Sequence, residues 1–248
     1  QGPLFPAEGL PREQWALRPA REILALKVCD MAMGSGAFLV QACRYLSERL
    51  VEAWAAAERA NTSRKARWIT AEGERTADPD QALPADEGER LLLARRLVAD
   101  RCLYGVDKNP LAVEMARLSL WLVTLQKSRP FTFLDHALKC GDSLVGVSRE
   151  QLQYWALHPE PGAARHAEPF GTAAEFERVI ALRRQVAALP ERDIRDTQLK
   201  AQKLADAERI THNLRAGGDL LVASYLSGKK GKAAQELRHA LWRAFRFG

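Results

Sequence analysis

The sequence DMAMGSGAFL, residues 30–39, contains a glycine turn between a short apolar run and a long amphipathic segment. The apolar run, residues 23–29, predicts a strand that ends at Asp30, because its length and flanks suit a buried strand. Beyond the turn, apolar residues recur at helical spacing from Leu39 to Ala57. This spacing predicts one long amphipathic helix.

The same succession of elements follows further along the chain. Residues 89–101 read as helical, and residues 101–106 predict a second strand that ends at Asp107. Asn109-Pro110 predicts a helix start, with asparagine as the N-cap and proline at the first helical position. A third predicted strand, at residues 131–134, and a turn then lead to Asp142. The order of strands and helices predicts the opening of a doubly wound parallel α/β sheet.

An aspartate follows each of the three predicted strands: Asp30, Asp107 and Asp142. Open α/β sheets bind ligands beyond the carboxyl ends of their strands. An acid after the second strand suits ribose hydroxyls, as in nicotinamide dinucleotide sites, and the third could accept from an exocyclic amine such as that of adenine. Each aspartate alone could equally cap a turn. Three of them along one sheet edge favour a ligand site.

The turn itself is chemically suited to a ligand. Gly34 and Gly36 carry no Cβ, so the backbone can approach a bound molecule closely. The free N–H groups at the start of the next helix would face a carboxylate or a phosphate. The turn spells neither GxGxxG nor a phosphate-binding GK[ST] loop.

The remaining segments differ from this α/β pattern. Residues 1–20 predict an irregular lead-in, and residues 61–88 an exposed insertion within an α/β domain that spans 21–150. Residues 171–248 predict a helical subdomain with no strand, broken at Gly217-Gly218.

The net charge of +6 belongs to this last segment. Residues 171–248 hold 15 Lys/Arg and 9 Asp/Glu, a difference of +6, whereas residues 1–170 hold 22 of each sign. A basic helical end suits phosphate contacts, although a solvated helical surface has the same composition.

Composition narrows the class of protein. The sequence contains no apolar run long enough to span a membrane and no secretory signal at its start. The cysteines, Cys29, Cys43, Cys102 and Cys140, lie far apart beside apolar neighbours, so we expect reduced core residues, no metal site and a cytoplasmic protein.

Three motifs together resemble those of adenine-N6 DNA methyltransferases, most closely the large enzymes of restriction-modification and phage defence. Residues 30–39 resemble D-P-A-x-G-S-G-x-F-L, and YGVDKNPLAV, residues 104–113, resembles the second family motif. The third is FLDH, residues 133–136, through GDSLVG, residues 141–146. The resemblance covers roughly residues 20–147 and implies a Rossmann-like class I methyltransferase fold.

The resemblance implies a site for S-adenosyl-L-methionine. Asp30 and the turn from Gly34 to Phe38 would hold the methionine moiety, Asp107 the ribose and Asp142 the adenine amine. A sulfonium cation with an ammonium group suits an acidic rim. Met31 replaces the usual proline, which should loosen the turn without removing a contact. The full set of expected cofactor-binding residues is Asp30, Ala32, Gly34, Ser35, Gly36, Phe38, Asp107, Lys108, Asp142 and Ser143.

The family's methyl-transfer motif, Asn/Asp-Pro-Pro-Tyr/Phe, does not occur in the sequence. We therefore expect no catalytic residue in this chain and a fragment that is inactive alone. We expect its partners to be double-stranded DNA, bound by the full-length methyltransferase, and the remainder of that parent chain, and we expect no membrane partner. Two alternatives stay open: a Rossmann oxidoreductase, and a non-catalytic methyltransferase-like module that binds DNA or protein.

Overall fold

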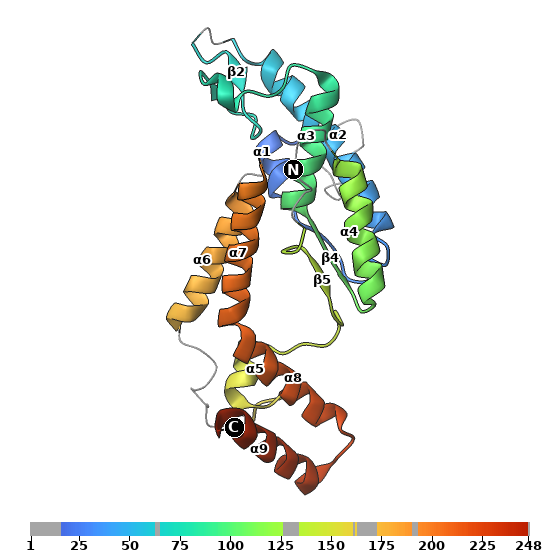
Figure 1. Cartoon of the computed structure of the whole chain (residues 1–248), viewed down its shortest axis with the longest axis vertical. Helices are drawn as coiled ribbons and strands as arrows, with labels where there is room; N and C mark the ends of the chain where they lie inside the picture. Colours follow the sequence, from blue (N-terminus) through green and yellow to red (C-terminus); the bar gives the residue numbers. More distant parts are fainter. Residues whose placement is uncertain are drawn as a thin grey trace. The chain divides into compact units, whose positions relative to one another are not determined.

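A three-stranded parallel sheet organises the first part of the chain in the computed structural model (Figure 1), which describes residues 16–62, 65–125, 134–160, 162, 173–189 and 193–247. Its strands are β1 (Val28–Asp30), β4 (Leu103–Asp107) and β5 (Leu138–Cys140), in the order β1-β4-β5. Val28 pairs with Leu103, and Gly105 with Leu138. The fold is therefore mixed α/β, a partial Rossmann-like sheet followed by helices.

Helices connect the parallel strands and form a layer on the sheet. α2 (Ala37–Arg59) and α3 (Glu87–Cys102) lie between β1 and β4, and α4 (Pro110–Thr124) lies between β4 and β5. The three helices pack against one another, and both α2 and α4 contact the sheet. Strand residues alternate accordingly: Leu103 and Gly105 are buried, whereas Tyr104 and Val106 are only partly so.

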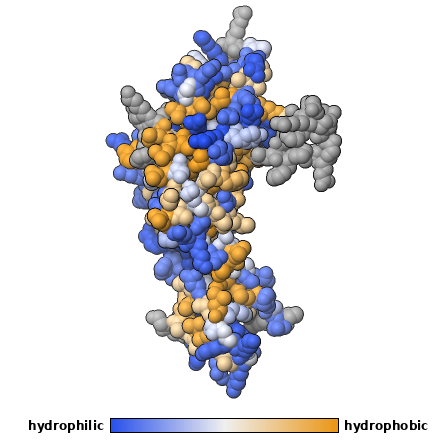
Figure 2. All heavy atoms as spheres, turned by 90° about the vertical axis from the view of Figure 1, so that its right-hand side faces the viewer, coloured by the Kyte–Doolittle hydropathy of each residue, from blue (hydrophilic) through white to orange (hydrophobic). Residues whose placement is uncertain are grey.

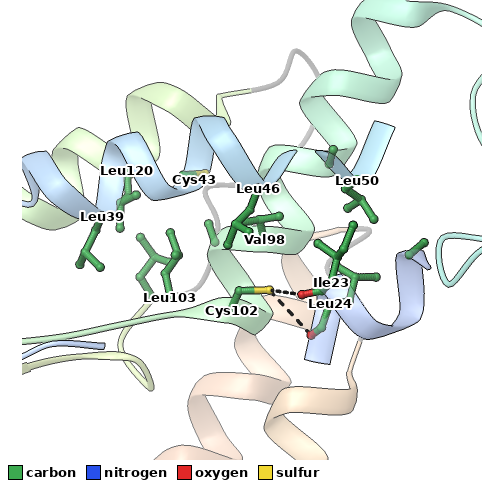
Figure 3. Close-up of a cluster of buried hydrophobic side chains, with 14 of the residues drawn as sticks. Ile23, Leu24, Leu39, Cys43, Leu46, Leu50, Val98, Cys102, Leu103 and Leu120 are labelled. Carbon is green, nitrogen blue, oxygen red and sulfur yellow. Dashed lines mark hydrogen bonds between the residues drawn. The ribbon is translucent and has the colours of Figure 1, made fainter. Parts of the chain in front are cut away.

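The core of this part is the predicted apolar face of α2. Leu39, Cys43, Leu46 and Leu50 point from α2 toward side chains of α1, α3 and β4 (Figure 3). At one end of the cluster the Cys102 thiol donates to the carbonyl oxygens of Ile23 and Leu24, at 3.6 and 3.7 Å. Burial of the α2 face confirms the helical periodicity.

The apolar run before Asp30 does not form one strand, as its length had suggested. Residues Ala20–Ala25 form a helix, α1, and only Val28–Asp30 belong to β1. The helix begins after Pro19, has Glu22 in its first turn and buries Ile23 and Leu24. An apolar run of this length does not distinguish a strand from a buried helical turn, and packing selects the helix here.

The segment 61–88 is not simply an exposed insertion. It contains a small antiparallel pair, β2 (Trp68–Ile69) and β3 (Arg75–Thr76), and a 3₁₀ turn, η2 (Pro79–Gln81). Ile69 and Leu83 belong to the hydrophobic core, which ties the segment to the domain.

The cysteine prediction holds for two positions and fails for two. Cys43 and Cys102 are buried, whereas Cys29 and Cys140 are exposed. Both exposed cysteines lie in short strands at the two edges of the sheet, where side chains are less covered than those of the central strand.

The chain divides into two compact units, Gln1–Gly141 with Glu191–Thr197, and Asp142–Pro190 with Gln198–Gly248. The first boundary between these units follows Gly141, whereas the sequence predicts an α/β domain up to residue 150. The reason is that Val147 and Leu152 belong to a second hydrophobic cluster, built around Trp155 and Leu221.

The second unit is helical, with α5 (Arg149–Tyr154), α6 (Ala173–Ala188), most of α7 (Ile194–Ile210), α8 (His212–Leu226) and α9 (Gly231–Phe247). Gly217-Gly218 does not break the chain as predicted, because both residues lie inside α8. A Cβ at Gly218 would come within 3.0 Å of the Val147 side chain, so this glycine permits close packing within a continuous helix.

Candidate functional site

The glycine turn after β1 is fastened to the neighbouring strand by its backbone. The Met33 N–H donates to the carbonyl of Val106 in β4 at 3.1 Å, and the Gly36 N–H donates back to the Met33 carbonyl at 2.8 Å. Gly34 and Gly36 have φ values of +53° and +81°, which favour glycine. Gly36 then serves as the N-terminal cap position of α2. The predicted turn and its connection into a long helix are both observed.

Asp107 joins the glycine turn to the end of the second strand. Its Oδ2 accepts from the Gly34 N–H at 2.9 Å, and its Oδ1 accepts from the Asn109 N–H at 2.8 Å. Residues 73 positions apart in the sequence are thus held together by one carboxylate. The first two sequence motifs therefore meet at one edge of the sheet.

These two hydrogen bonds also fix the charge of Asp107. The backbone N–H groups of Asn109 and Gly34 lower the pKa of its carboxyl below the ordinary value, because they stabilise the ionised form. The group is therefore an anion at neutral pH. A carboxylate has about four lone-pair positions, so it retains capacity for further donors such as hydroxyls.

Asp30 lies at the end of β1, beside the strand that carries Asp107 but further from the carboxyl edge of the sheet. Asp30 pairs in register with Gly105, so Asp107 is two residues further along toward the carboxyl edge. The Asp30 Oδ1 accepts from the Ala32 N–H at 3.1 Å and so supports the first bend of the turn. The turn-capping role predicted for a lone aspartate is real here, and it leaves the second carboxylate oxygen for another donor.

The two glycines of the turn have different surroundings. A Cβ on Gly36 would lie 3.0 Å from the Ala116 Cβ and 3.1 Å from its Cα, so Gly36 is required for packing against α4. Around Gly34, no atom lies within 4 Å of the corresponding position. Of the two, Gly34 is the one that offers open space to a ligand.

The other predicted residues of the first unit lie on or beside this turn. Ala32, Ser35 and Phe38 are exposed, Phe38 with 58% of its surface accessible. Lys108 follows Asp107 and is exposed, and its carbonyl oxygen lies 3.8 Å from the Cys140 thiol. An exposed aromatic at the start of a helix is an available stacking surface.

Asp142 and Ser143 follow β5 but belong to the second unit. The preceding residue, Gly141, donates its N–H to the Asp107 carbonyl at 2.9 Å, and the Asp142 Oδ1 accepts from the Leu144 N–H at 3.0 Å. The structure therefore brings the first two aspartates together within one unit. The role of Asp142 toward the same ligand stays a prediction, as does that of Ser143.

Two supporting residues were not singled out in the sequence. Met33 is buried, and a Cβ on Gly105 would come within 2.3 Å of its sulfur. The absence of a side chain at Gly105 therefore leaves room for Met33 to pack over the central strand. The glycine in YGVD was the available signal, since a glycine inside a strand often marks a close approach.

Carboxylates, a glycine turn and a helix N-terminus meet at this edge. Such a set fits a ligand that combines hydroxyls and cationic groups with a carboxylate. The aspartates can accept from the hydroxyls and attract the cationic groups, and the helix N-terminus can attract the carboxylate. In the described part of the chain, no group of three or more His, Cys, Asp or Glu side chains is arranged to hold a metal ion. None of the described helices is both long and apolar enough to cross a membrane.

Comparison with protein families identifies the chain. Residues 12–144 match the family described as MmeI, DNA-methyltransferase domain, and residues 101–214 match the Eco57I restriction-modification methylase. No curated protein and no solved structure matches. The first match spans more than half of the 248 residues and includes the turn, Asp107 and all three strands of the sheet. The chain therefore belongs to the MmeI DNA-methyltransferase domain family and is a DNA methyltransferase of the restriction-modification kind.

Proposed function

We propose that the first unit binds S-adenosyl-L-methionine for methylation of adenine at N6 in double-stranded DNA. The observation that carries the proposal is the Asp107 carboxylate, which bridges the glycine turn and the second strand through Gly34 and Asn109. When bound, the cofactor would supply an electrophilic methyl group. This chain's part would be to bind and orient it.

Each residue of the site would contact one part of the cofactor. Asp107, ionised by its backbone donors, would accept from the ribose hydroxyls. Asp30 would attract the ammonium group, and the Gly34 turn would admit the amino-acid portion against the start of α2. Phe38 would cover it, and Asp142 would accept from the adenine amine. Ala32, Ser35, Lys108 and Ser143 complete the expected contacts.

Adenine as the target base rests on the three motifs and their resemblance to adenine-N6 enzymes. The Eco57I match supports a role in restriction-modification and, with it, in defence against phage. Since the four cysteines are free thiols, we expect a cytoplasmic enzyme. The 248 residues contain no Asn/Asp-Pro-Pro-aromatic sequence, so we expect this chain to bind cofactor without transferring its methyl group until the remaining methyltransferase sequence is present.

Isothermal titration of the chain with S-adenosylhomocysteine tests the proposal. We expect saturable binding, weakened about tenfold or more by Asp107→Ala, because a charged acceptor of two hydroxyls is removed. Asp107→Asn should have an intermediate effect, since the amide keeps one acceptor oxygen.

Asp78→Ala is the matched control. The Asp78 Oδ1 accepts from the Asp80 N–H at 2.9 Å, the same turn contact that Asp107 makes with Asn109, in a turn that contains none of the predicted cofactor-binding residues. Unchanged affinity in Asp107→Ala, with the fold intact by circular dichroism, would contradict the proposal. A parallel titration with NADH separates it from an oxidoreductase, which would bind the dinucleotide instead.

A further inference from the structure

Nearly all of the net charge is concentrated in one helix and the loop before it. Residues 229–247 contain six Lys/Arg and one Glu, a difference of +5, against +6 for the whole chain. The segment includes α9 and the preceding Lys229-Lys230. The remainder of the basic segment recognised in the sequence is close to neutral. The charge is therefore a local feature and not a general property of the surface.

The charges of α9 form a stripe along the helix. Lys232, Glu236, His239, Arg243 and Arg246 recur at intervals of four, three, four and three residues, which keeps them on one side of an α-helix. All five residues are exposed. Lys232 has an ion-pair contact with Glu236 at 3.8 Å, and it remains 89% accessible. Lys232 and Arg243 are eleven residues apart in the helix, so the stripe between them is about 16 Å long.

The opposite face of α9 is anchored in the second unit. Leu241, Trp242 and Phe245 pack on the cluster around Trp155, and the Trp155 and Phe245 rings stack with centroids 6.1 Å apart. The Trp155 Nε1–H also donates to the carbonyl of Arg238 at 2.9 Å. Because its apolar side is already packed, α9 presents its basic side outward in a fixed orientation.

A cavity with aromatic and basic walls adjoins the stripe. It has a volume of about 530 Å³ and lies within the second unit. Its lining consists of residues from α5 with its C-cap and from α9, namely Tyr154, Trp155, Gln235, Arg238, His239, Trp242 and Arg243. The Arg238 guanidinium is held 4.9 Å from the Tyr225 ring centroid, and that of Arg246 lies 5.2 Å from the Trp242 ring. These arginines are positioned before any ligand arrives.

We infer that the α9 stripe, with its adjoining cavity, is a contact surface for the phosphate backbone of double-stranded DNA. The inference rests on the proposed function, because the DNA of a methyltransferase reaction is the polyanion that the chain would meet. DNA presents one negative charge per about 1.7 Å of helix axis, so a stripe of this length faces several phosphates. Lysine, arginine and tryptophan N–H groups are donors only, which suits phosphate oxygens.

An anionic membrane surface is the rival partner, since basic amphipathic helices with tryptophan and phenylalanine also bind lipid. Such a helix inserts its apolar face between headgroups. In α9 that face, with Leu241 and Phe245, is packed against the second unit's own cluster. Only the polar side remains available, and this favours a polyanion that is bound without insertion.

Fluorescence anisotropy of the 248-residue chain with a short labelled DNA duplex of arbitrary sequence tests the inference. The double variant Lys232→Gln/Arg243→Gln should weaken binding on the order of tenfold. It should also reduce the slope of log affinity against log salt by about two, since each lost phosphate contact removes about 0.9.

The charge-matched control is Arg178→Gln/Arg184→Gln, which removes two exposed arginines from α6 in the same unit. Equal losses in both double variants would overturn the inference, as would preferential binding to phosphatidylserine vesicles. Titration with S-adenosylhomocysteine keeps the two proposals apart. Lost DNA binding with intact cofactor binding in the α9 variant supports the surface, and a chain that binds DNA but no cofactor contradicts only the proposed function.

Discussion

At the scale of single residues, alanine substitutions at the two glycines of the turn distinguish the cost of backbone strain from the cost of steric overlap. Gly34→Ala forces an alanine into a left-handed conformation with open space around its Cβ, and we expect a cost of roughly 1–2 kcal/mol. Gly36→Ala introduces the same backbone strain and also places the new Cβ 3.0 Å from the Ala116 Cβ. We therefore expect it to lower the free energy of unfolding by about 1–3 kcal/mol more than Gly34→Ala does. Urea unfolding of both variants measures the difference. Equal losses would mean that α4 yields to the extra methyl group.

The cysteines provide a second residue-scale prediction. Burial raises the pKa of the Cys43 thiol to about 12 and that of Cys102 to about 11, so both stay protonated and covered. Cys29 and Cys140 are exposed. Thiol titration with a chromogenic disulfide at pH 8 should therefore detect two fast-reacting groups in the folded chain and four in denaturant. Cys29→Ser should lower the fast count by one, and four fast thiols in the folded chain would contradict the packing of α2 and α3.

At the scale of elements, α4 exposes an apolar stripe. Leu111, Met115, Leu118 and Leu122, followed by Leu125, recur at intervals of four and three residues and remain 49–66% accessible. Figure 2 views the side that carries α4 in Figure 1 and shows hydrophobic side chains gathered over its upper part. Contiguous exposed apolar surface of this kind usually promotes association.

We therefore expect the purified chain to associate reversibly as its concentration rises. Leu118→Lys/Leu122→Lys should shift sedimentation toward the monomer and change the unfolding free energy by less than about 0.5 kcal/mol per site. Ile194→Lys in α7, at an exposed apolar position outside the stripe, is the control. Association that persists in the double variant would exclude α4 as the contact.

Elements with chemical start signals were predicted well from the sequence. Asn109 caps α4 with its Oδ1 accepting from the Leu111 N–H at 3.0 Å, as its position before proline had indicated. Elements for which the sequence offers only a hydrophobic pattern were predicted less well. Residues 23–25, predicted as part of a strand, belong to α1, and Gly217-Gly218, predicted as a break, lie inside α8. Packing against distant segments decides between local conformations of similar energy.

At the scale of the whole molecule, the candidate site was only partly predictable. The aspartates at strand ends followed from the order of elements, and the structure joins Asp107 to the glycine turn. The division at Gly141 had no sequence signal, since it depends on Val147 packing with Trp155 and Leu221 far along the chain. Long-range burial of this kind has no local pattern, and it leaves Asp142 in the second unit.

The stability of the molecule should depend on pH through carboxyl groups that the fold keeps ionised. Partial burial alone would raise the pKa of Glu72, but the hydrogen bond and charge of Arg101, 2.9 Å away, lower it below 4.5 overall. The pKa of Asp107 is lowered as well, by Asn109 and Gly34. A lowered folded-state pKa contributes stability that is complete above the unfolded-state value and is lost as the pH falls through the folded-state value.

We therefore expect the urea midpoint to be nearly constant from neutral pH down to about pH 5 and to fall below about pH 4.5 as these groups take up protons. Arg101→Gln should lower the midpoint at neutral pH and flatten the acid decline, because Glu72 then titrates close to its unfolded-state value. Arg21→Gln is the control, since its contact with Glu74 is longer, at 3.6 Å, and both side chains are mostly exposed. If Arg101→Gln showed the same acid decline as the parent chain, the Glu72 pair would not be its source.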